Sequence, residues 1–340
     1  MSNATLTTLQ HFTGLQDLGP EGLERILNQA SAWKGSFPKH LMDKLLGMVF
    51  FNPSLRTRAS FEAAMARGGG SSIVLEVGNG VWKLEDRIGA VMDGDRAEHV
   101  REAVPVLARY VDALAVRTFA TCADDDADHA DPVMNAFRNL STVPVISMES
   151  AREHPCQGLA DLLTVKETFG VTKSVPVTLT WAPHIKPLPK AVPNSFLFSA
   201  AAAGCEVRVA HPKGFELHPS ILAEAQAFAA TTGGSVTVTN DQDEALAGSK
   251  VVYAKAWGPS TASGVGPDAV KAHPEWLVGR KQMEQADREA IFLHCLPVRR
   301  NVEVGDDVLD HPSSRVVDQA ENRFHVQRAL LDWLFNSEKN

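Results

Sequence analysis

The chain has 340 residues, of which 44% are apolar and 22% are charged, and its formal net charge is −8. This length predicts about two domains, and the composition is typical of a globular protein. The acidic balance argues against a general nucleic-acid-binding surface, so an anionic substrate would need a locally basic pocket.

Cysteine usage and the N-terminus indicate the compartment. Cys122, Cys156, Cys205 and Cys295 form no C-x-x-C pair, which argues against a structural zinc site. The first residues lack the positive and apolar regions of a signal peptide, and no apolar run approaches the roughly 20 residues of a membrane span. We therefore expect a cytoplasmic protein with reduced thiols and no membrane contact.

The first half of the chain alternates apolar runs with helical patterns. An amphipathic face formed by Leu23, Ile26, Leu27 and Ala30 predicts the first helix. The apolar runs and the helical patterns predict strands at 47–51, 72–77, 112–116 and 143–148, and helices at 19–35, 56–69 and 99–111. The acidic segment 124–132 is predicted to be an exposed loop, and a metal site there is not favoured.

The second half repeats this alternation. Its apolar runs predict strands at 176–182, 205–211, 235–240, 250–257 and 290–297, and helices at 194–204, 221–233 and 320–335. Alternating strands and helices are typical of parallel sheets covered by helices on both faces. We therefore predict an α/β fold with two doubly wound parallel-sheet domains, one formed by residues 1–150 with 320–338 and the other by 151–319.

A polar turn follows the first predicted strand, in the sequence FFNPSLRTRASFE of residues 50–62. Ligands of parallel α/β sheets bind beyond the carboxyl ends of the strands, and a helix start there offers free N–H groups and the positive end of the helix dipole. Ser54 and Thr57 add hydroxyls, and Arg56 and Arg58 add planar guanidinium groups suited to phosphate or carboxylate. The turn predicts a phosphate site, although an N-cap serine with solvated arginines, or one arginine in an internal ion pair, is the simpler alternative.

Further chemically active residues also follow predicted strands or begin helices. Arg117 follows the strand at 112–116, and His154 and Gln157 follow the strand at 143–148. The sequence HCLPVRR at 294–300 follows another strand, and Arg323 lies in the last helix. Packing alone does not explain this distribution. Neither a Walker loop nor a G-x-G-x-x-G turn is present, which argues against a nucleotide-dependent dehydrogenase.

Three motifs, S-x-R-T-R, HPCQ and HCLP, together resemble the aspartate/ornithine carbamoyltransferase family over nearly the whole chain. The resemblance implies carbamoyl phosphate as a substrate, two α/β domains with the C-terminal helix packing back on the first, and a homotrimer with active sites at subunit interfaces. It implies that carbamoyl phosphate binds a set of residues from both domains: Ser54, Leu55, Arg56, Thr57, Trp82, Arg117, His154, Gln157, Leu296 and Arg323.

The chemistry of such a transfer fits these residue types. An amine attacks the carbamoyl carbon, a tetrahedral oxyanion forms, and phosphate leaves. Arg117 and His154, with Thr57, would stabilise the oxyanion, and Arg56 would stabilise the leaving phosphate. Positioning the two substrates together would supply much of the rate. We expect no metal and no organic cofactor, because carbamoyl phosphate is already activated.

The amine acceptor is indicated by a missing motif. The D-x-x-x-S-M-G segment of ornithine carbamoyltransferases is absent, and residues 181–196 and 253–258 resemble the N-acylornithine branch instead. A capped α-nitrogen carries no charge, so an acidic group placed to bind it would be left unpaired. The resemblance implies an acceptor site formed by Ala97, Glu149, Asn194, Lys255, Cys295 and Arg299.

The acyl group is predicted from Ala97. Acetyl-specific relatives carry a glutamate at this position, which would repel the carboxylate of a succinyl group, whereas alanine does not. We therefore favour N-succinyl-L-ornithine over N-acetyl-L-ornithine, in arginine biosynthesis, with Lys186, Lys190 or Arg96 as the cation that meets the succinyl carboxylate.

One departure from the acetyl-type enzymes lies just after the HCLP motif. Those enzymes can carry a carboxylated lysine there, and this chain has Glu303, so we predict no carboxylysine. A plain surface or ion-pair role for Glu303 is the alternative. Free ornithine, aspartate or putrescine as acceptor, or an inactive relative acting as a binding subunit, are less favoured than an N-acylornithine enzyme.

Overall fold

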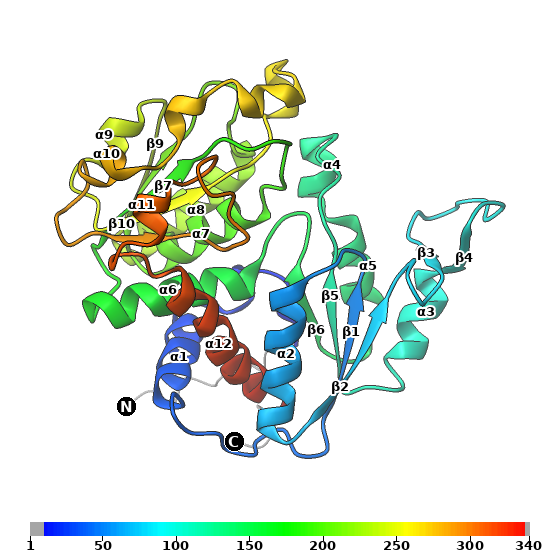
Figure 1. The fold of residues 1–340 in the computed structure, drawn as a ribbon. Coiled ribbons are helices and arrows are strands. Elements are labelled where there is room, and N and C mark those ends of the chain that lie inside the picture. The colour runs from blue at the N-terminus through cyan, green and yellow to red at the C-terminus, as the bar shows by residue number, and fades with distance from the viewer. Residues whose placement is uncertain (1–9, 337–340) are drawn as a thin grey trace. The chain divides into compact units, whose positions relative to one another are not determined.

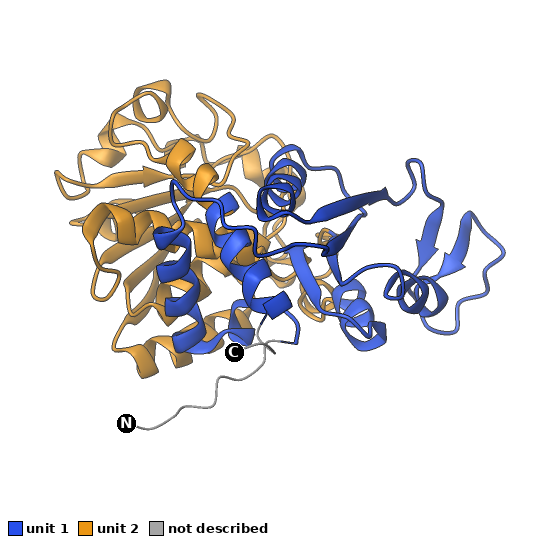
Figure 2. Ribbon diagram, turned by 90° about the horizontal axis from the view of Figure 1, so that it is seen from below, with its two compact units in different colours: residues 1–118, 132–149, 324–340 blue, residues 119–131, 150–323 orange. Residues whose placement is uncertain are grey.

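The computed structural model describes residues 10–336. The chain forms two compact units, coloured blue and orange in Figure 2. Unit 1 comprises the described parts of residues 1–118, 132–149 and 324–340, and unit 2 comprises the described parts of 119–131 and 150–323. No helix between residues 10 and 336 combines the length and the apolarity that crossing a lipid bilayer requires.

Unit 1 is built on a parallel sheet with the strand order β2-β1-β5-β6 (Figure 1). Its strands are β1 (Leu45–Phe50), β2 (Ser71–Glu76), β5 (Ala113–Arg117) and β6 (Val145–Glu149). Its main helices are α1 (Gly19–Ala32), α2 (Leu55–Gly68), α3 (Val100–Leu107) and α5 (Pro132–Leu140), with the short helix η1 (Leu15–Asp17) before them. Every residue of β5 and β6 is buried, as expected for parallel strands covered on both faces.

Local sequence explains the bounds of the first two long helices. Helix α1 buries the predicted apolar face formed by Leu23, Ile26, Leu27 and Ala30. Helix α2 begins after Ser54, whose side chain accepts a hydrogen bond from the backbone N–H of Thr57. Its C-cap is Gly69, whose φ of 91° lies in the left-handed region that glycine adopts most readily.

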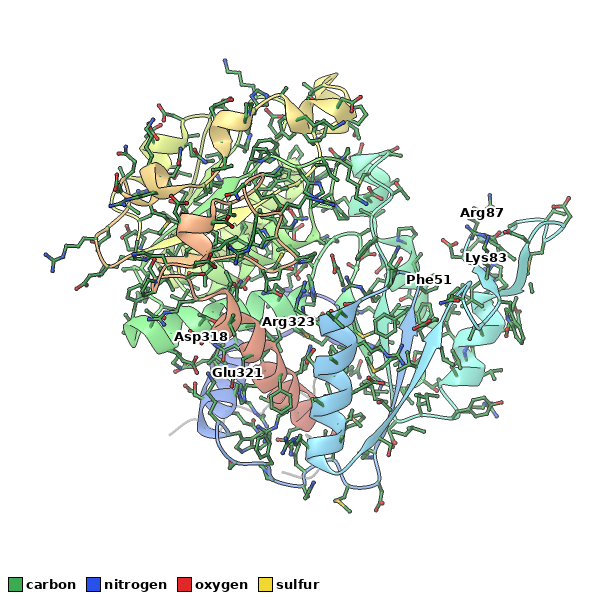
Figure 3. The ribbon with its side chains drawn as sticks, viewed as in Figure 1. Phe51, Lys83, Arg87, Asp318, Glu321 and Arg323 are labelled. Atoms are coloured by element: carbon green, nitrogen blue, oxygen red, sulfur yellow. The ribbon has the colours of Figure 1, made fainter. Side chains whose placement is uncertain are left out.

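A second, smaller sheet in unit 1 was missed by the sequence pattern. Strands β3 (Lys83–Glu85) and β4 (Arg96–His99) pair in parallel, with a register shift between Lys83 and Leu84. Strands this short carry little periodicity, which explains why the pattern did not reveal them. Figure 3 labels Lys83 and Arg87 on this segment, which we call the β3–β4 segment (residues 82–99).

Unit 2 is built on a parallel sheet with the strand order β11-β10-β7-β8-β9. Its strands are β7 (Pro176–Trp181), β8 (Glu206–Ala210), β9 (Ser235–Thr239), β10 (Val251–Lys255) and β11 (Ile291–Leu293). Its helices are α4 (Asp125–His129), α6 (Pro155–Phe169), α7 (Ala191–Ala202), α8 (Pro219–Thr232), α9 (Gln242–Leu246), α10 (Arg280–Met283), α11 (Asp306–Leu309), η2 (Thr261–Ser263), η3 (Pro267–Lys271) and η4 (Pro274–Trp276). All nine predicted strands exist, so the prediction of two parallel-sheet α/β domains is confirmed.

The acidic segment at 124–132 is not a loop, which corrects the sequence prediction. Asp124 caps helix α4 by accepting hydrogen bonds from the backbone N–H groups of Asp126 and Ala127. Asp125 accepts from Lys190 and from the backbone of Thr261, so part of the acidic charge is neutralised within unit 2. A capping aspartate explains why a run of poor helix formers becomes helical here.

The last helix, α12 (Val316–Asn336), begins in unit 2 and ends in unit 1. In unit 1 its buried Arg328 donates hydrogen bonds to the carbonyls of Trp33 and Ser36. The guanidinium also lies over the rings of Trp33, Phe37 and Phe324, at 4.8–5.4 Å from their centroids. These contacts attach the C-terminal helix to the first domain, as predicted.

Candidate active site

The turn after β1 leads into the N-terminus of helix α2. Leu55, the first residue of α2, is 81% exposed, and the N-terminus of a helix favours an anion through its N–H groups and dipole. The Ser54 hydroxyl accepts from the Thr57 N–H at 3.2 Å, which makes Ser54 the N-cap of α2. The N-cap alternative and the phosphate site are therefore compatible, because a hydroxyl that accepts one hydrogen bond can still donate another.

The two arginines of this turn have different surroundings. Arg58 donates to Glu76 at 2.7 Å and lies 3.7 Å from Glu62, and its side chain is 44% exposed. Arg58 is thus the internal ion-pair partner that the sequence left open. Arg56 is half-buried at the start of α2. Arg56 remains the candidate for phosphate.

Arg117 lies at the end of β5 and is buried. Its Nη1 lies 2.7 Å from a carboxylate oxygen of Glu149, at the end of the neighbouring strand β6, and donates to the Thr57 hydroxyl at 3.2 Å. Parallel strands bring Arg117 and Glu149 together, because the carboxyl ends of β5 and β6 share one edge of the sheet. The structure thus joins Thr57, Arg117 and Glu149 into one buried polar cluster within unit 1.

Trp82 and Ala97 lie together on the β3–β4 segment. The Trp82 indole donates to Glu98 at 2.7 Å, and Glu98 adjoins Ala97 on β4. Trp82 is 58% exposed and Ala97 is exposed as well. Trp82 is therefore accessible to a ligand or to another subunit.

The HPCQ motif begins helix α6 in unit 2. The backbone N–H of His154 donates to the Ser195 hydroxyl at 2.7 Å, and His154 and Gln157 are both buried. Pro155 occupies the first turn of the helix, where its fixed φ and missing N–H cost nothing. The side-chain nitrogen of Gln157 donates to Asp161, one turn further along α6, at 2.8 Å.

The HCLP motif follows β11. The backbone N–H of Leu296 donates to Nδ1 of the buried His294 at 2.9 Å, so the ring proton of neutral His294 lies on Nε2, 3.2 Å from a carboxylate oxygen of Glu303. Leu296 has a φ of 54°, in the left-handed region that residues other than glycine seldom adopt. Cys295 between them is buried and forms no disulfide bond.

Glu303 is only 1% exposed, so the alternative of a surface acid is wrong. Its carboxylate accepts from the backbone N–H of Arg299 at 3.1 Å and interacts with His294. Burial raises the pKa of Glu303, but the hydrogen bond from His294 and the electrostatic effects of His294, Lys255 and His184 together bring it below the ordinary value. Glu303 therefore supplies a permanent carboxylate beside the predicted acceptor residues.

His184 holds the side chain of Arg299, and the sequence did not single it out. Its Nε2 accepts from Arg299 Nε at 3.1 Å, so the proton of neutral His184 lies on Nδ1, which is 2.7 Å from the Lys186 carbonyl. Burial lowers the pKa of His184, and the charges of Lys255 and Arg299 add to this effect, whereas the Lys186 carbonyl and Glu303 oppose it. Neutral His184 is the form that this contact needs. No motif marks it, since its partners are 2 and 115 positions away in the chain.

Lys255 and Asn194 are the remaining predicted acceptor residues of unit 2. Lys255 is the buried last residue of β10, and its charge lowers the pKa values of Glu303 and His184, which places it near both. Asn194 lies in the first turn of α7 and donates its side-chain N–H to the Arg152 carbonyl at 2.9 Å.

A cavity of about 300 Å³ in unit 2 includes Asn194 in its lining. Of the other predicted acceptor residues, Lys255, Cys295 and Arg299 do not line it. The cavity wall is formed mainly by residues 120–129, 187–190 and 258–267. The structure thus groups Lys255 with Arg299 through their shared neighbours and places Asn194 at a separate cavity.

Arg323 is buried on α12, in the turns that also carry Asp318 and Glu321 (Figure 3). Its charge lowers the pKa of two buried groups of α6, Cys156 and Asp161, although burial raises both to a greater extent. The Arg323 guanidinium therefore lies near the HPCQ helix within unit 2.

The fold and these residues together define an enzyme class. One unit carries a helix start beside a buried arginine, and the other carries histidine, cysteine, lysine and arginine at strand ends, a set that fits a transferase taking a group from a phosphorylated donor. Family models for the two domains of aspartate/ornithine carbamoyltransferase match here: the carbamoyl-P binding domain over residues 10–167 and the Asp/Orn binding domain over residues 189–334. The chain belongs to the aspartate/ornithine carbamoyltransferase family, and it is a carbamoyltransferase.

Similar proteins act on two related acceptors. N-acetylornithine carbamoyltransferase of Xanthomonas campestris is 39% identical over 330 residues, which cover 95% of this chain and 97% of that protein. N-succinylornithine carbamoyltransferase of Bacteroides thetaiotaomicron is 40% identical over 318 residues, which cover 93% and 95% of the two chains. The crystal structure of acetylornithine transcarbamylase complexed with acetylcitrulline has a TM-score of 0.91 at 40% identity, covering 96% of this chain and 99% of that one.

Proposed function

We propose that this enzyme transfers the carbamoyl group of carbamoyl phosphate to the δ-amine of N-succinyl-L-ornithine, giving N-succinyl-L-citrulline and phosphate in arginine biosynthesis. The observation that carries the choice of acyl group is Ala97, a small uncharged residue on the exposed β3–β4 segment. N-acetyl-L-ornithine is the second candidate, because relatives of nearly equal identity are named for each acyl group.

The donor half of the reaction would use the start of α2 and the buried cluster around Arg117, both in unit 1, together with the start of α6 in unit 2. The α2 N-terminus with Ser54, Leu55 and Arg56 would bind the phosphate, and the positive helix end would stabilise the charge that develops as phosphate leaves. Arg117, held by Glu149 and by Thr57, would donate to the carbamoyl oxygen as it becomes an oxyanion, together with His154. Gln157 and the Leu296 carbonyl would bind the carbamoyl NH₂, and Arg323 and Trp82 would complete the donor site.

The acceptor half uses unit 2, together with Ala97 and Glu149 of unit 1. Arg299, held by His184 and Glu303, would bind the α-carboxylate together with Lys255. Cys295 would lie beside the attacking amine, and Asn194 would contact the acyl-amino group. The preformed contacts of Arg299 support this role, because a side chain already ordered loses less entropy when it binds a substrate.

Solved relatives support a role for a glutamate in acyl-group choice. They include variants of N-acetyl-L-ornithine transcarbamylase in which one glutamate is replaced by alanine, serine, valine or proline, complexed with carbamyl phosphate and N-succinyl-L-norvaline. We place Ala97 at the position of that glutamate. The chain would then accept a succinyl group because it lacks the carboxylate that repels it.

Lys186 is the cation that best suits the succinyl carboxylate. Lys190 is engaged by both carboxylate oxygens of Asp125, and Arg96 donates to Glu85 and Asp86. No ion pair involves Lys186 within residues 10–336, and its carbonyl is fixed by His184, the residue that holds Arg299. An α-carboxylate bound at Arg299 would leave the neighbouring acyl group near Lys186.

The assembly and compartment complete the proposal. A homotrimer would bring Trp82 and Ala97 of one subunit to the site of the next, which is consistent with their exposure in the single chain. The four cysteines, all free, are consistent with a reducing cytoplasm. Residues 1–150 with 320–338 would carry the carbamoyl phosphate site, and residues 151–319 the acceptor site.

The experiment that tests the function is a steady-state assay with carbamoyl phosphate and three acceptors: N-succinyl-, N-acetyl- and free L-ornithine. We expect the highest kcat/KM with N-succinyl-L-ornithine. A higher value with N-acetyl-L-ornithine would select the second candidate, and turnover of free ornithine alone would reject both.

Ala97→Glu is expected to reverse the acyl preference. The new carboxylate would repel the succinyl carboxylate and occupy its space, so the ratio of kcat/KM for succinyl over acetyl substrate should fall by about 10²-fold. The same assay measures this ratio. Ala97→Gln is the matched control for size without charge and should lower the ratio less, and an unchanged ratio in Ala97→Glu would place the acyl group elsewhere.

Lys186→Met is expected to raise KM for N-succinyl-L-ornithine by about fivefold, because an exposed charge pair with substrate contributes up to roughly 1 kcal/mol. KM for N-acetyl-L-ornithine should change by less than about twofold, since the acetyl group has no charge. Lys213→Met, at an exposed lysine of the same unit, is the control. Equal effects on both substrates would assign Lys186 to another part of the site.

A further inference from the structure

A buried row of hydrogen-bonded side chains connects the HCLP and HPCQ motifs within unit 2. The row consists of Gln319, Asp161 and Gln157. The backbone N–H of His294 donates to Gln319 Oε1 at 3.0 Å, and Gln319 Nε2 donates to Asp161 Oδ1 at 2.6 Å. The same Asp161 oxygen accepts from Gln157 Nε2 at 2.8 Å. Asp161 and Gln319 are completely buried, and Gln157 is 1% exposed. Neither Asp161 nor Gln319 belongs to a motif that the sequence singled out.

The donor and acceptor atoms of this row are fixed by their partners. Nitrogen and oxygen of a side-chain amide have nearly the same shape, so their placement follows from their partners. A backbone N–H can only donate, so the group of Gln319 next to His294 must be the oxygen, and its nitrogen must face Asp161. Asp161 Oδ1 thus receives two N–H groups, and Gln157 must also present its nitrogen to it.

Protonation of Asp161 leaves this direction unchanged. Burial raises the pKa of Asp161 to about 7. The hydrogen bonds from Gln319 and Gln157 oppose this rise in the pKa, and Arg323 and Tyr253 oppose it to a smaller extent. The two donors both occupy Oδ1, so a proton would reside on Oδ2. Oδ1 accepts hydrogen bonds in either state.

The remaining group of Gln157 is its oxygen. Oε1 is buried and has no hydrogen-bond partner among the described residues. Leaving a buried acceptor unsatisfied costs about 1–3 kcal/mol, which a ligand with an N–H group would recover. A methyl group in the same place would not.

We propose that Asp161 and Gln319 are positioning residues, which fix the Gln157 amide so that its oxygen selects a carbamoyl NH₂ over a methyl group on the donor. This inference rests on the proposed function. Carbamoyl phosphate and acetyl phosphate differ only in this substituent. The inference is that the buried row, which begins at the backbone N–H of His294, determines which of the two the enzyme binds.

The test measures KM for carbamoyl phosphate and the inhibition constant Ki of acetyl phosphate, with the acceptor at saturation. The wild-type enzyme is expected to prefer carbamoyl phosphate by at least about tenfold. In Asp161→Leu, of similar size but without acceptors, Gln157 is free to turn, and the preference should fall to about twofold or less, mainly through KM for carbamoyl phosphate. Asp161→Asn keeps an oxygen for both amides, so the preference should stay within about threefold of wild type.

Gln319→Met is the second variant, for use if Asp161→Leu does not fold. It should also reduce the preference for carbamoyl phosphate, because it removes the N–H group that Gln319 donates to Asp161. An unchanged preference in the folded variants would overturn the inference and leave the proposed function intact. Equal weakening of both acyl phosphates would also overturn it, since that is the mark of a general structural defect. A wild-type enzyme that does not use carbamoyl phosphate would instead overturn the proposed function, and this inference with it.

Discussion

Arg117→Ala is expected to lower kcat/KM by about 10³-fold, and most of the loss should be in kcat. A preorganised cation that stabilises an oxyanion acts mainly in the transition state, and removal of one such donor typically costs 10²–10³-fold in rate. In the structure Arg117 is already ordered by Glu149 and Thr57, so it needs little reorganisation at the moment of reaction. Steady-state kinetics with the preferred acceptor measures the effect.

The control for this substitution must separate chemistry from folding. Alanine leaves the buried carboxylate of Glu149 without the cation at 2.7 Å, and an uncompensated buried charge is destabilising. Arg117→Lys keeps a positive charge there and loses the planar fork, so it should unfold near the wild-type temperature yet remain at least about tenfold slower. Wild-type rates in a folded Arg117→Ala enzyme would remove Arg117 from the reaction.

Arg56→Ala is expected to lower kcat/KM by about 10²-fold or more, with a raised KM for carbamoyl phosphate. A charge-assisted hydrogen bond to phosphate is among the strongest that a side chain makes, and the helix start alone would supply only part of the anion binding. The measurement is kinetics with carbamoyl phosphate as the varied substrate, together with competitive inhibition by inorganic phosphate, which should weaken in parallel.

Arg58→Ala is the matched control for Arg56, because it removes the same side chain two residues away in the same helix turn. Arg58 pairs with Glu76 at a half-exposed site, and such pairs contribute about 0–1 kcal/mol to stability. Its kcat/KM should stay within about threefold of the wild-type value. Equal losses in the two variants would show that the turn binds phosphate through general positive charge and not through Arg56 in particular.

The positions of the strands were predictable from sequence because burial on both faces leaves a simple signal. Runs such as residues 112–116 and 250–257 are apolar, and β5 and β10 are fully buried. The β3–β4 segment and helix α4 were not found, since short elements depend on capping and neighbouring contacts more than on periodicity. The hydrogen bonds of Asp124 and Asp125 decide α4, and one of them reaches Thr261, 136 residues away.

Sequence alone determined the parallel α/β class, the family and the residue types that follow the strands, because these depend on local pattern and on short motifs. The tertiary structure decided how those residues are used: that Arg58 is an ion-pair partner, that Glu303 is buried, that His184 holds Arg299, and that Asp161 sets the direction of Gln157. The reason is physical: the charge state and hydrogen-bond direction of a side chain are fixed by neighbours that folding brings from distant parts of the chain.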